Sequence, residues 1–91
     1  MTPENVYKQA SNKWGTKAQI IVAIEEMSEL IQALTKHLRT DLVTDNLAEE
    51  IADVEIMIEQ LRTIFVELND KIDSFKKAKI ERLAKKINDI K

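Results

Sequence analysis

The sequence has no cysteine, one glycine (Gly15), one proline (Pro3) and one histidine (His37) among its 91 residues. Without cysteine the chain has no disulfide, no thiolate zinc site and no cysteine nucleophile. A single glycine excludes a glycine-rich phosphate loop, and a single histidine argues against a Ser–His–Asp triad and a di-iron bundle built on Glu-x-x-His pairs. Any catalytic chemistry must therefore come from carboxylates, lysines, arginines or hydroxyls.

Long apolar runs are missing as well. None approaches the roughly 20 residues that span a bilayer, and the opening residues, MTPENVYKQ, are too polar for a signal peptide. We therefore expect a cytoplasmic protein with no membrane partner. Apolar residues make up 44% of the chain, which predicts one folded domain over residues 1–91. With so few turn-forming residues, that domain is predicted to be all-α.

The formal net charge of −2 conceals a strong segregation of charge along the chain. Residues 22–69 contain 11 acidic and three basic residues, whereas residues 70–91 contain four acidic and eight basic ones. Such segments are often solvated helix faces that neutralise each other. The alternative is a cation site in the middle of the chain with anion-binding lysines and arginines beside it.

Helical periodicity and capping residues predict four helices, over residues 3 to about 12, 16–19 to about 38, 44–45 to 65–68, and about 70–90. Gly15 is free to adopt a positive φ and ends the first helix. The segment Thr16 to Gln19 has the pattern of a capping box before the second helix. Thr44 or Asp45 caps the third.

Helical wheels predict the apolar faces of the two central helices. In the second helix the main stripe comprises Ile20, Ile24, Met27, Ile31, Leu34 and Leu38. In the third helix it comprises Leu47, Ile51, Val54, Ile58, Leu61 and Phe65. Further apolar residues widen the arc of the third helix to roughly 220°, which is more than a four-helix monomer of this size can cover. A homo-oligomer is therefore expected.

Two acidic pairs occur on these helices, Glu26-x-x-Glu29 and Glu50-x-x-Asp53, each with apolar neighbours one turn away. The loop between the helices is short, so the helices are expected to be antiparallel neighbours that bring the four carboxylates together. Clustered carboxylates raise one another's pKa unless a divalent cation neutralises them, and Mg²⁺ prefers oxygen ligands. The alternative interpretation is an exposed acidic surface paired with lysines.

The segment Glu25-Glu26-x-x-Glu29, followed after 20 residues by Glu50-x-x-Asp53, resembles a known family signature. It is similar to the E-E-x-x-E…E-x-x-D motif of the MazG-like nucleotide pyrophosphohydrolases, in the all-α NTP pyrophosphatase superfamily that also contains the dimeric dUTPases. Supporting features extend the resemblance over roughly residues 8–88: Trp14-Gly15, Gln19, Leu30 and the basic segment 76–82. The resemblance implies a four-helix MazG-like bundle completed by homo-oligomerisation, as a dimer or a dimer of dimers.

The resemblance also implies a reaction. Nucleoside or deoxynucleoside triphosphates would be hydrolysed between the α and β phosphates, giving the monophosphate and pyrophosphate, in nucleotide-pool control or house-cleaning. Mg²⁺ is the implied cofactor, with Mn²⁺ as a substitute.

Roles follow for individual residues on the same basis. Glu25 is the implied catalytic group, which orients or deprotonates the attacking water or joins the metal set through a second ion. The implied metal ligands are Glu26, Glu29, Glu50 and Asp53. The implied substrate-binding residues are Lys79, Arg82, Lys76, Trp14 and Gln19. For these last five the alternatives are a solvated helix surface for the cations, a core or interface position for Trp14, and a capping role for Gln19.

Two functions of other classes remain open. The chain could be a non-enzymatic, homo-oligomeric helical module that binds a protein partner. Nucleic-acid binding through the basic fourth helix is disfavoured by the pI of about 5.4 and by the acidic middle segment.

Overall fold

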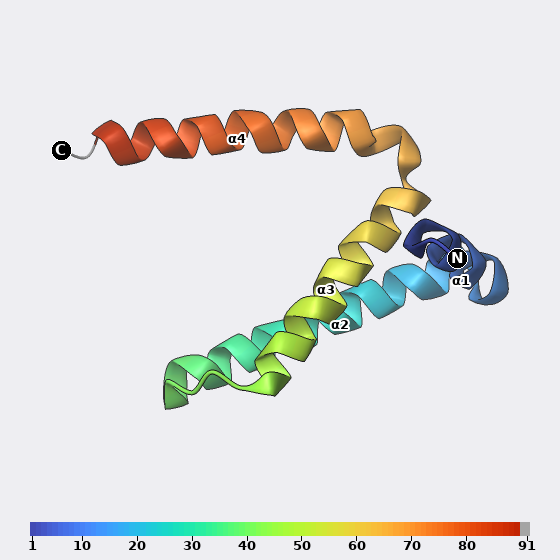
Figure 1. Cartoon of the computed structure of the whole chain (residues 1–91), viewed down its shortest axis with the longest axis horizontal. Coiled ribbons are helices and arrows are strands. Elements are labelled where there is room, and N and C mark those ends of the chain that lie inside the picture. Colours follow the sequence, from blue (N-terminus) through green and yellow to red (C-terminus); the bar gives the residue numbers. More distant parts are fainter. Residues whose placement is uncertain (90–91) are drawn as a thin grey trace.

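The computed structural model describes residues 1–89, and Figure 1 shows that this part of the chain is built from helices. They are α1 (Pro3–Trp14), α2 (Thr16–Thr40), α3 (Asp45–Ile64), the short 3₁₀ turn η1 (Val66–Leu68) and α4 (Asn69–Asp89). The all-α prediction is confirmed, and the helix boundaries fall within a few residues of those predicted. The predicted end of the fourth helix, at Ile90, lies outside the described residues. None of the described helices is both long and apolar enough to cross a membrane.

The helix ends show which capping predictions hold. The Thr44 hydroxyl accepts a hydrogen bond from the Leu47 N–H (3.2 Å), as predicted for the start of α3. Gly15 separates α1 from α2 with a φ of 93°, a backbone conformation that glycine adopts readily. The predicted capping box is wrong: Gly15 is the N-cap of α2 and no side chain caps this end. Because the chain passes from α1 into α2 through one residue, Thr16 is already helical, and Gln19 is buried in the fold instead.

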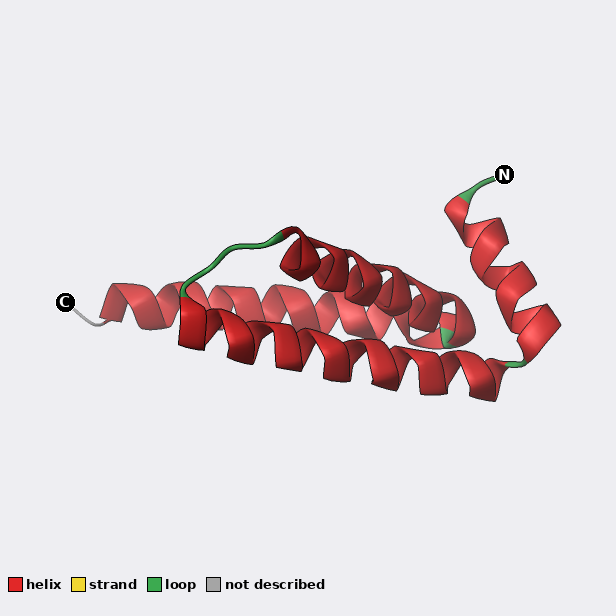
Figure 2. Cartoon of the chain, turned by 90° about the horizontal axis from the view of Figure 1, so that it is seen from below, coloured by secondary structure: helices red, strands yellow, loops and turns green. Residues whose placement is uncertain are grey.

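Helices α2 and α3 form an antiparallel hairpin joined by residues 41–44 (Figure 2). Asp41 adopts the left-handed conformation, with a φ of 58°, and its N–H donates to the His37 carbonyl at 2.7 Å. The His37 ring nitrogen Nδ1 bonds to the Leu42 carbonyl at 2.7 Å. The single histidine of the chain therefore holds the turn of the hairpin.

The face of α2 that meets α3 differs from the predicted one. The hydrophobic residues buried among those described are Ala23 on α2 and Met57 on α3. Ile24, Ile31 and Leu38, from the predicted main stripe of α2, are 62%, 64% and 79% exposed. The buried side of α2 includes Ala23, Leu30 and Ala33 and is turned by roughly 100° around the helix from the centre of that stripe, so these large aliphatic side chains stay outside the α2–α3 contact. The chain thus leaves its most apolar helical face uncovered.

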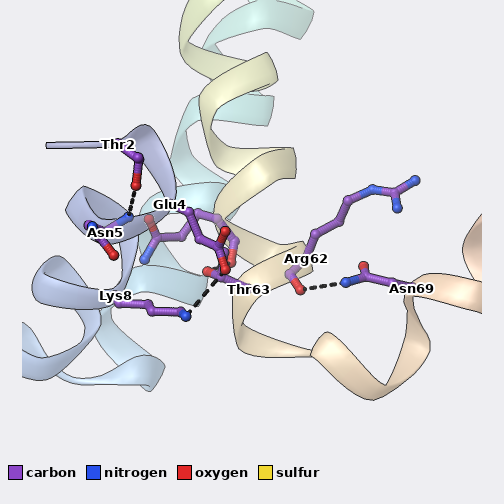
Figure 3. A network of polar contacts seen from close by, with 8 residues as sticks. Thr2, Glu4, Asn5, Lys8, Arg62, Thr63 and Asn69 are labelled. Atoms are coloured by element: carbon purple, nitrogen blue, oxygen red, sulfur yellow. Dashed lines mark hydrogen bonds and ion pairs between the residues drawn. The ribbon is translucent and has the colours of Figure 1, made fainter.

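Helix α1 packs across the C-terminal half of α3 through polar contacts. Gln60, which is 2% exposed, donates from its amide nitrogen to the Tyr7 carbonyl (3.0 Å) and the Ser11 hydroxyl (2.9 Å). The Tyr7 hydroxyl donates to the carboxylate of Glu59. Beside these contacts, Lys8 pairs with Glu4 at 3.2 Å, and both side chains line the hollow between α1 and the end of α3 (Figure 3). These bonds fix α1 on the hairpin although α1 itself has no buried residue.

Helix α4 leaves the end of α3 and extends away from the other helices (Figure 1). Its described packing is mainly with η1. At the junction the Asn69 amide donates to the Arg62 carbonyl at 3.3 Å (Figure 3), and Arg62 forms an ion pair with Asp73 at 3.0 Å. Apart from Asn69 and Ile72, every described residue of α4 is exposed. Among residues 1–89, the fourth helix is therefore attached mainly at its N-terminal end.

Candidate metal centre

The hairpin brings together carboxylates from both acidic pairs. Glu26 and Glu29 lie one turn apart on α2, and Glu50 lies on the first half of α3. Each of the three can place one carboxylate oxygen within 4.8 Å of the others. Glu26 and Glu50 are half-buried between the helices, whereas Glu29 is exposed at the edge of the cluster. The predicted proximity is confirmed for these three; their role as metal ligands stays a prediction.

Asp53, the fourth predicted ligand, lies half-buried one turn after Glu50 and outside the three-residue set. Its charge nevertheless raises the pKa of both Glu26 and Glu50, so it belongs to the same acidic cluster. We call Glu26, Glu29, Glu50 and Asp53 the carboxylate cluster.

The electrostatics of the carboxylate cluster oppose ionisation of its two inner members. Burial raises the pKa of Glu26, and the charges of Glu29, Asp53 and Glu50 raise it further. Burial likewise raises the pKa of Glu50, followed by the charges of Glu29, Asp53 and Glu49. Each of these neighbouring charges is acidic, and no lysine or arginine contributes a compensating effect. The cluster is therefore a region of concentrated negative charge that no lysine or arginine among residues 1–89 neutralises.

Two oxygens of the cluster also lack hydrogen-bond partners. Oε2 of Glu26 and Oε2 of Glu50 are buried and accept no hydrogen bond from any described group. A buried carboxylate oxygen without a donor is costly, and native structures usually pair such atoms with a donor, a water or an ion. Carboxylate oxygens from several residues are also the donor set that Mg²⁺ and Mn²⁺ take in proteins. The residues present therefore fit a hard divalent cation.

The predicted catalytic residue, Glu25, precedes Glu26 on α2 and is exposed. It is not part of the three-residue set. Its catalytic role therefore stays a prediction.

The predicted phosphate-binding cations are not brought to the cluster by their own chain. Lys76, Lys79 and Arg82 lie exposed on α4, which packs mainly against η1. Lys76 lies near the concave corner between α3 and α4 instead. A phosphate group held at the cluster would need these side chains from another copy or from a differently placed α4.

The two remaining predicted substrate contacts have different surroundings. Trp14 ends α1 and is 61% exposed, with the Lys13 ammonium 5.2 Å from the centre of its ring. It is free to stack on a partner and is not a core residue of this chain. Gln19 is buried on α2, so it contributes to helix packing within the chain.

Sequence reasoning missed Gln60, the most deeply buried polar residue of α3. Met57, a buried apolar residue, lies one turn before Gln60 on the same face of α3. The helical spacing from Met57 could therefore have predicted that Gln60 is buried. Its partners on α1 come from tertiary contacts some 50 residues away, which periodicity does not reveal.

A scan against protein-family models, a search of curated proteins and a search of solved structures each return no match to this chain. The side chains described above are therefore the basis for assigning a function.

Proposed function

We propose that the chain is a MazG-like nucleotide pyrophosphohydrolase that hydrolyses nucleoside or deoxynucleoside triphosphates between the α and β phosphates. The carboxylate cluster carries the proposal. Its oxygens come from an E-E-x-x-E segment on one helix and an E-x-x-D segment on the next, and two of them are buried without partners. A cluster with this donor set suits a divalent cation, and Mg²⁺ is the cation that accompanies nucleotide phosphates.

Each residue of the cluster then has a defined task. Glu26, Glu29, Glu50 and Asp53 would hold Mg²⁺, with Mn²⁺ as a substitute. When bound, the cation polarises phosphoryl oxygens and lowers the pKa of the attacking water. Glu25, which is exposed and precedes Glu26 on α2, would orient that water or accept its proton.

Substrate binding is assigned to side chains outside the cluster. Lys79 and Arg82, with Lys76 beside them, would bind phosphate oxygens because ammonium and guanidinium groups form charge-assisted hydrogen bonds to phosphate. Trp14 offers an exposed ring for a nucleobase, in line with its 61% exposure. Gln19 is the weakest of the proposed contacts because it is buried against the hairpin.

The proposal includes a homo-oligomer, a dimer or a dimer of dimers, located in the cytoplasm. The uncovered apolar face of α2 supports this part of the proposal, since monomeric proteins rarely leave such a face in water. The uncovered face equally favours the second candidate, a homo-oligomeric helical module that binds a protein partner without catalysis. That module predicts a dispensable carboxylate cluster and no effect of Mg²⁺ on stability.

The test is a panel of nucleoside and deoxynucleoside triphosphates, incubated with Mg²⁺ and read out as released pyrophosphate. We expect pyrophosphate from at least one nucleotide, and a loss of about 100-fold or more in Glu50→Gln, given that even residues behind metal ligands contribute 10–100-fold. Glu55→Gln is the matched control, because Glu55 is exposed on the same helix and outside the cluster. No turnover of any nucleotide, with Mg²⁺ leaving stability unchanged, would leave the interaction module as the better assignment.

A further inference from the structure

The chain exposes far more surface than a folded monomer of its size. Its accessible area is 7475 Å², whereas a monomer of 10.5 kDa exposes about 5,400 Å² by the usual scaling with mass. Its radius of gyration is 16.5 Å, against about 12 Å expected for a compact domain of this length. The excess of about 2,000 Å² exceeds the roughly 800 Å² that each partner buries in a standard protein interface. The excess exposed area of one chain is therefore as large as the area that a partner buries in a large, obligate interface.

Helix α4 provides much of this uncovered surface. Its apolar residues form one stripe at helical spacing: Ile72, Phe75, Ile80, Leu83 and Ile87. All but Ile72 are more than half exposed. The helix also has seven basic and four acidic residues. An isolated amphipathic helix gains its stability from packing of its apolar face, so α4 requires a partner surface.

Helix α3 offers a complementary surface that its own chain leaves open. Ile51 and Ile58 lie seven residues apart on its exposed side, and Phe65, the C-cap residue of α3, follows at the same spacing. Where α3 meets α4, Ile58 and Phe65 join Ile72 in lining a concave corner of about 450 Å³. Helix α3 contains six acidic residues and one basic residue, so its charge is opposite to that of α4.

We propose that α4 of each chain packs along the exposed side of α3 in a second copy, with the apolar stripe of α4 covering Ile51, Ile58 and Phe65. The exchange is reciprocal about a two-fold axis, because both surfaces occur on every chain and a two-fold interface pairs the same elements twice. The two helices have 20 and 21 residues, so each is about 30 Å long and one can cover the other over its full length. Opposite charges on the two helices favour this pairing over α4 against α4.

This inference goes beyond the proposed hydrolysis, since an inactive protein would form the same dimer. Where the proposed function also holds, the exchange would bring basic residues of α4 onto a second copy's acidic hairpin.

The absence of native cysteine allows a direct crosslinking test on the full-length chain. One preparation carries Ile58→Cys, and a second carries Lys79→Cys or Lys86→Cys at the edge of the α4 stripe. The two are mixed in equal amounts and treated with a short bismaleimide, and peptide mapping identifies the joined residues. We expect a covalent pair that links position 58 of one chain to α4 of the other. The matched control, Lys85→Cys, lies two residues after Leu83 and therefore on the opposite side of α4, and it should give at most a few per cent of that yield.

A second measurement tests the stripe without crosslinking. Light scattering should give twice 10.5 kDa or a multiple of it for the native protein. Leu83→Asp should shift it to the monomer mass, because the charge falls in the centre of the stripe. Ser74→Asp adds the same charge nine residues earlier, on the opposite side of α4, and should leave the mass unchanged.

Three results would overturn the proposal. The first is a native protein that is monomeric by light scattering, together with a double variant, Ile58→Cys with Lys86→Cys, in which the crosslink forms only within one chain. Another is a dimer joined only through α4 to α4. The last is equal dissociation by Leu83→Asp and Ser74→Asp. A failure of nucleotide hydrolysis alone would leave all of these measurements interpretable.

Discussion

Replacing Glu50 with Gln should change stability in opposite directions with and without Mg²⁺. Glu50 is half-buried, one of its oxygens has no partner, and burial and acidic neighbours raise its pKa. Without a cation, the ionised carboxylate of Glu50 therefore opposes folding. The neutral amide keeps the shape of the side chain and removes the charge. Metal-free Glu50→Gln should melt above the metal-free native protein at pH 8.

With Mg²⁺ the order should reverse. A ligand that binds only the folded state at 100 times its Kd adds about 2.7 kcal/mol to the free energy of unfolding. For 91 residues the unfolding entropy is about 0.19 kcal/mol per kelvin, so this gain corresponds to a rise of about 14 °C in Tm. Glu50→Gln loses one of three close carboxylates and should retain only a small part of that rise.

The assay is thermal unfolding followed by circular dichroism, in EDTA and across a series of Mg²⁺ concentrations. Glu55→Gln serves as the control and should follow the native protein in both conditions. The reasoning is refuted if the native protein and Glu50→Gln melt together in EDTA and Mg²⁺ shifts neither. A Mg²⁺ shift of equal size in both would place the cation elsewhere.

Three further outcomes follow from other features. The pKa of Glu50 is raised in the folded chain, so folding takes up a proton between about pH 4.5 and that raised value, and stability falls as pH rises through this window. The metal-free Tm advantage of Glu50→Gln should therefore grow from pH 4.5 to pH 8 in parallel melts; a constant difference would contradict this. Gln60→Leu leaves the Tyr7 carbonyl and the Ser11 hydroxyl without their donor and should cost about 2–4 kcal/mol in urea unfolding. A loss below 0.5 kcal/mol, on the order of a surface change, would show that these bonds do not hold α1. Met57→Ala removes buried side-chain atoms between α2 and α3 and should lower the free energy of unfolding by about 2–4 kcal/mol in the same experiment. An unchanged midpoint would place Met57 outside the core.

The local features of the fold could be predicted from the sequence because they depend on neighbouring residues. Thr44 caps α3 through a hydrogen bond three residues along the chain, and Gly15 supplies the positive φ between α1 and α2. The proximity of Glu26, Glu29 and Glu50 also followed from local facts, namely the i, i+3 spacing and a short connecting loop. Each of these needs only helix geometry.

The packing of whole faces could not be predicted in the same way. The stripe that contains Ile24, Ile31 and Leu38 is the more apolar side of α2, yet α3 packs on the side that contains Ala23. A hydropathy pattern shows which faces avoid water but not which neighbour covers each of them. The same holds for α4, whose direction depends on the turn after Ile64, and for Gln60, whose partners lie on α1.

The central claim is that the carboxylate cluster holds a divalent cation, and crystals grown with Mn²⁺ test it most directly. Mn²⁺ substitutes for Mg²⁺ at oxygen sites and gives an anomalous signal that locates it without reference to the fold. We expect an anomalous peak for a Mn²⁺ ion that is bound by carboxylate oxygens of Glu26, Glu29 and Glu50. Crystals of Glu50→Gln should show no peak at this position. Crystals of the native protein in Mn²⁺ with no peak at these residues would contradict the claim.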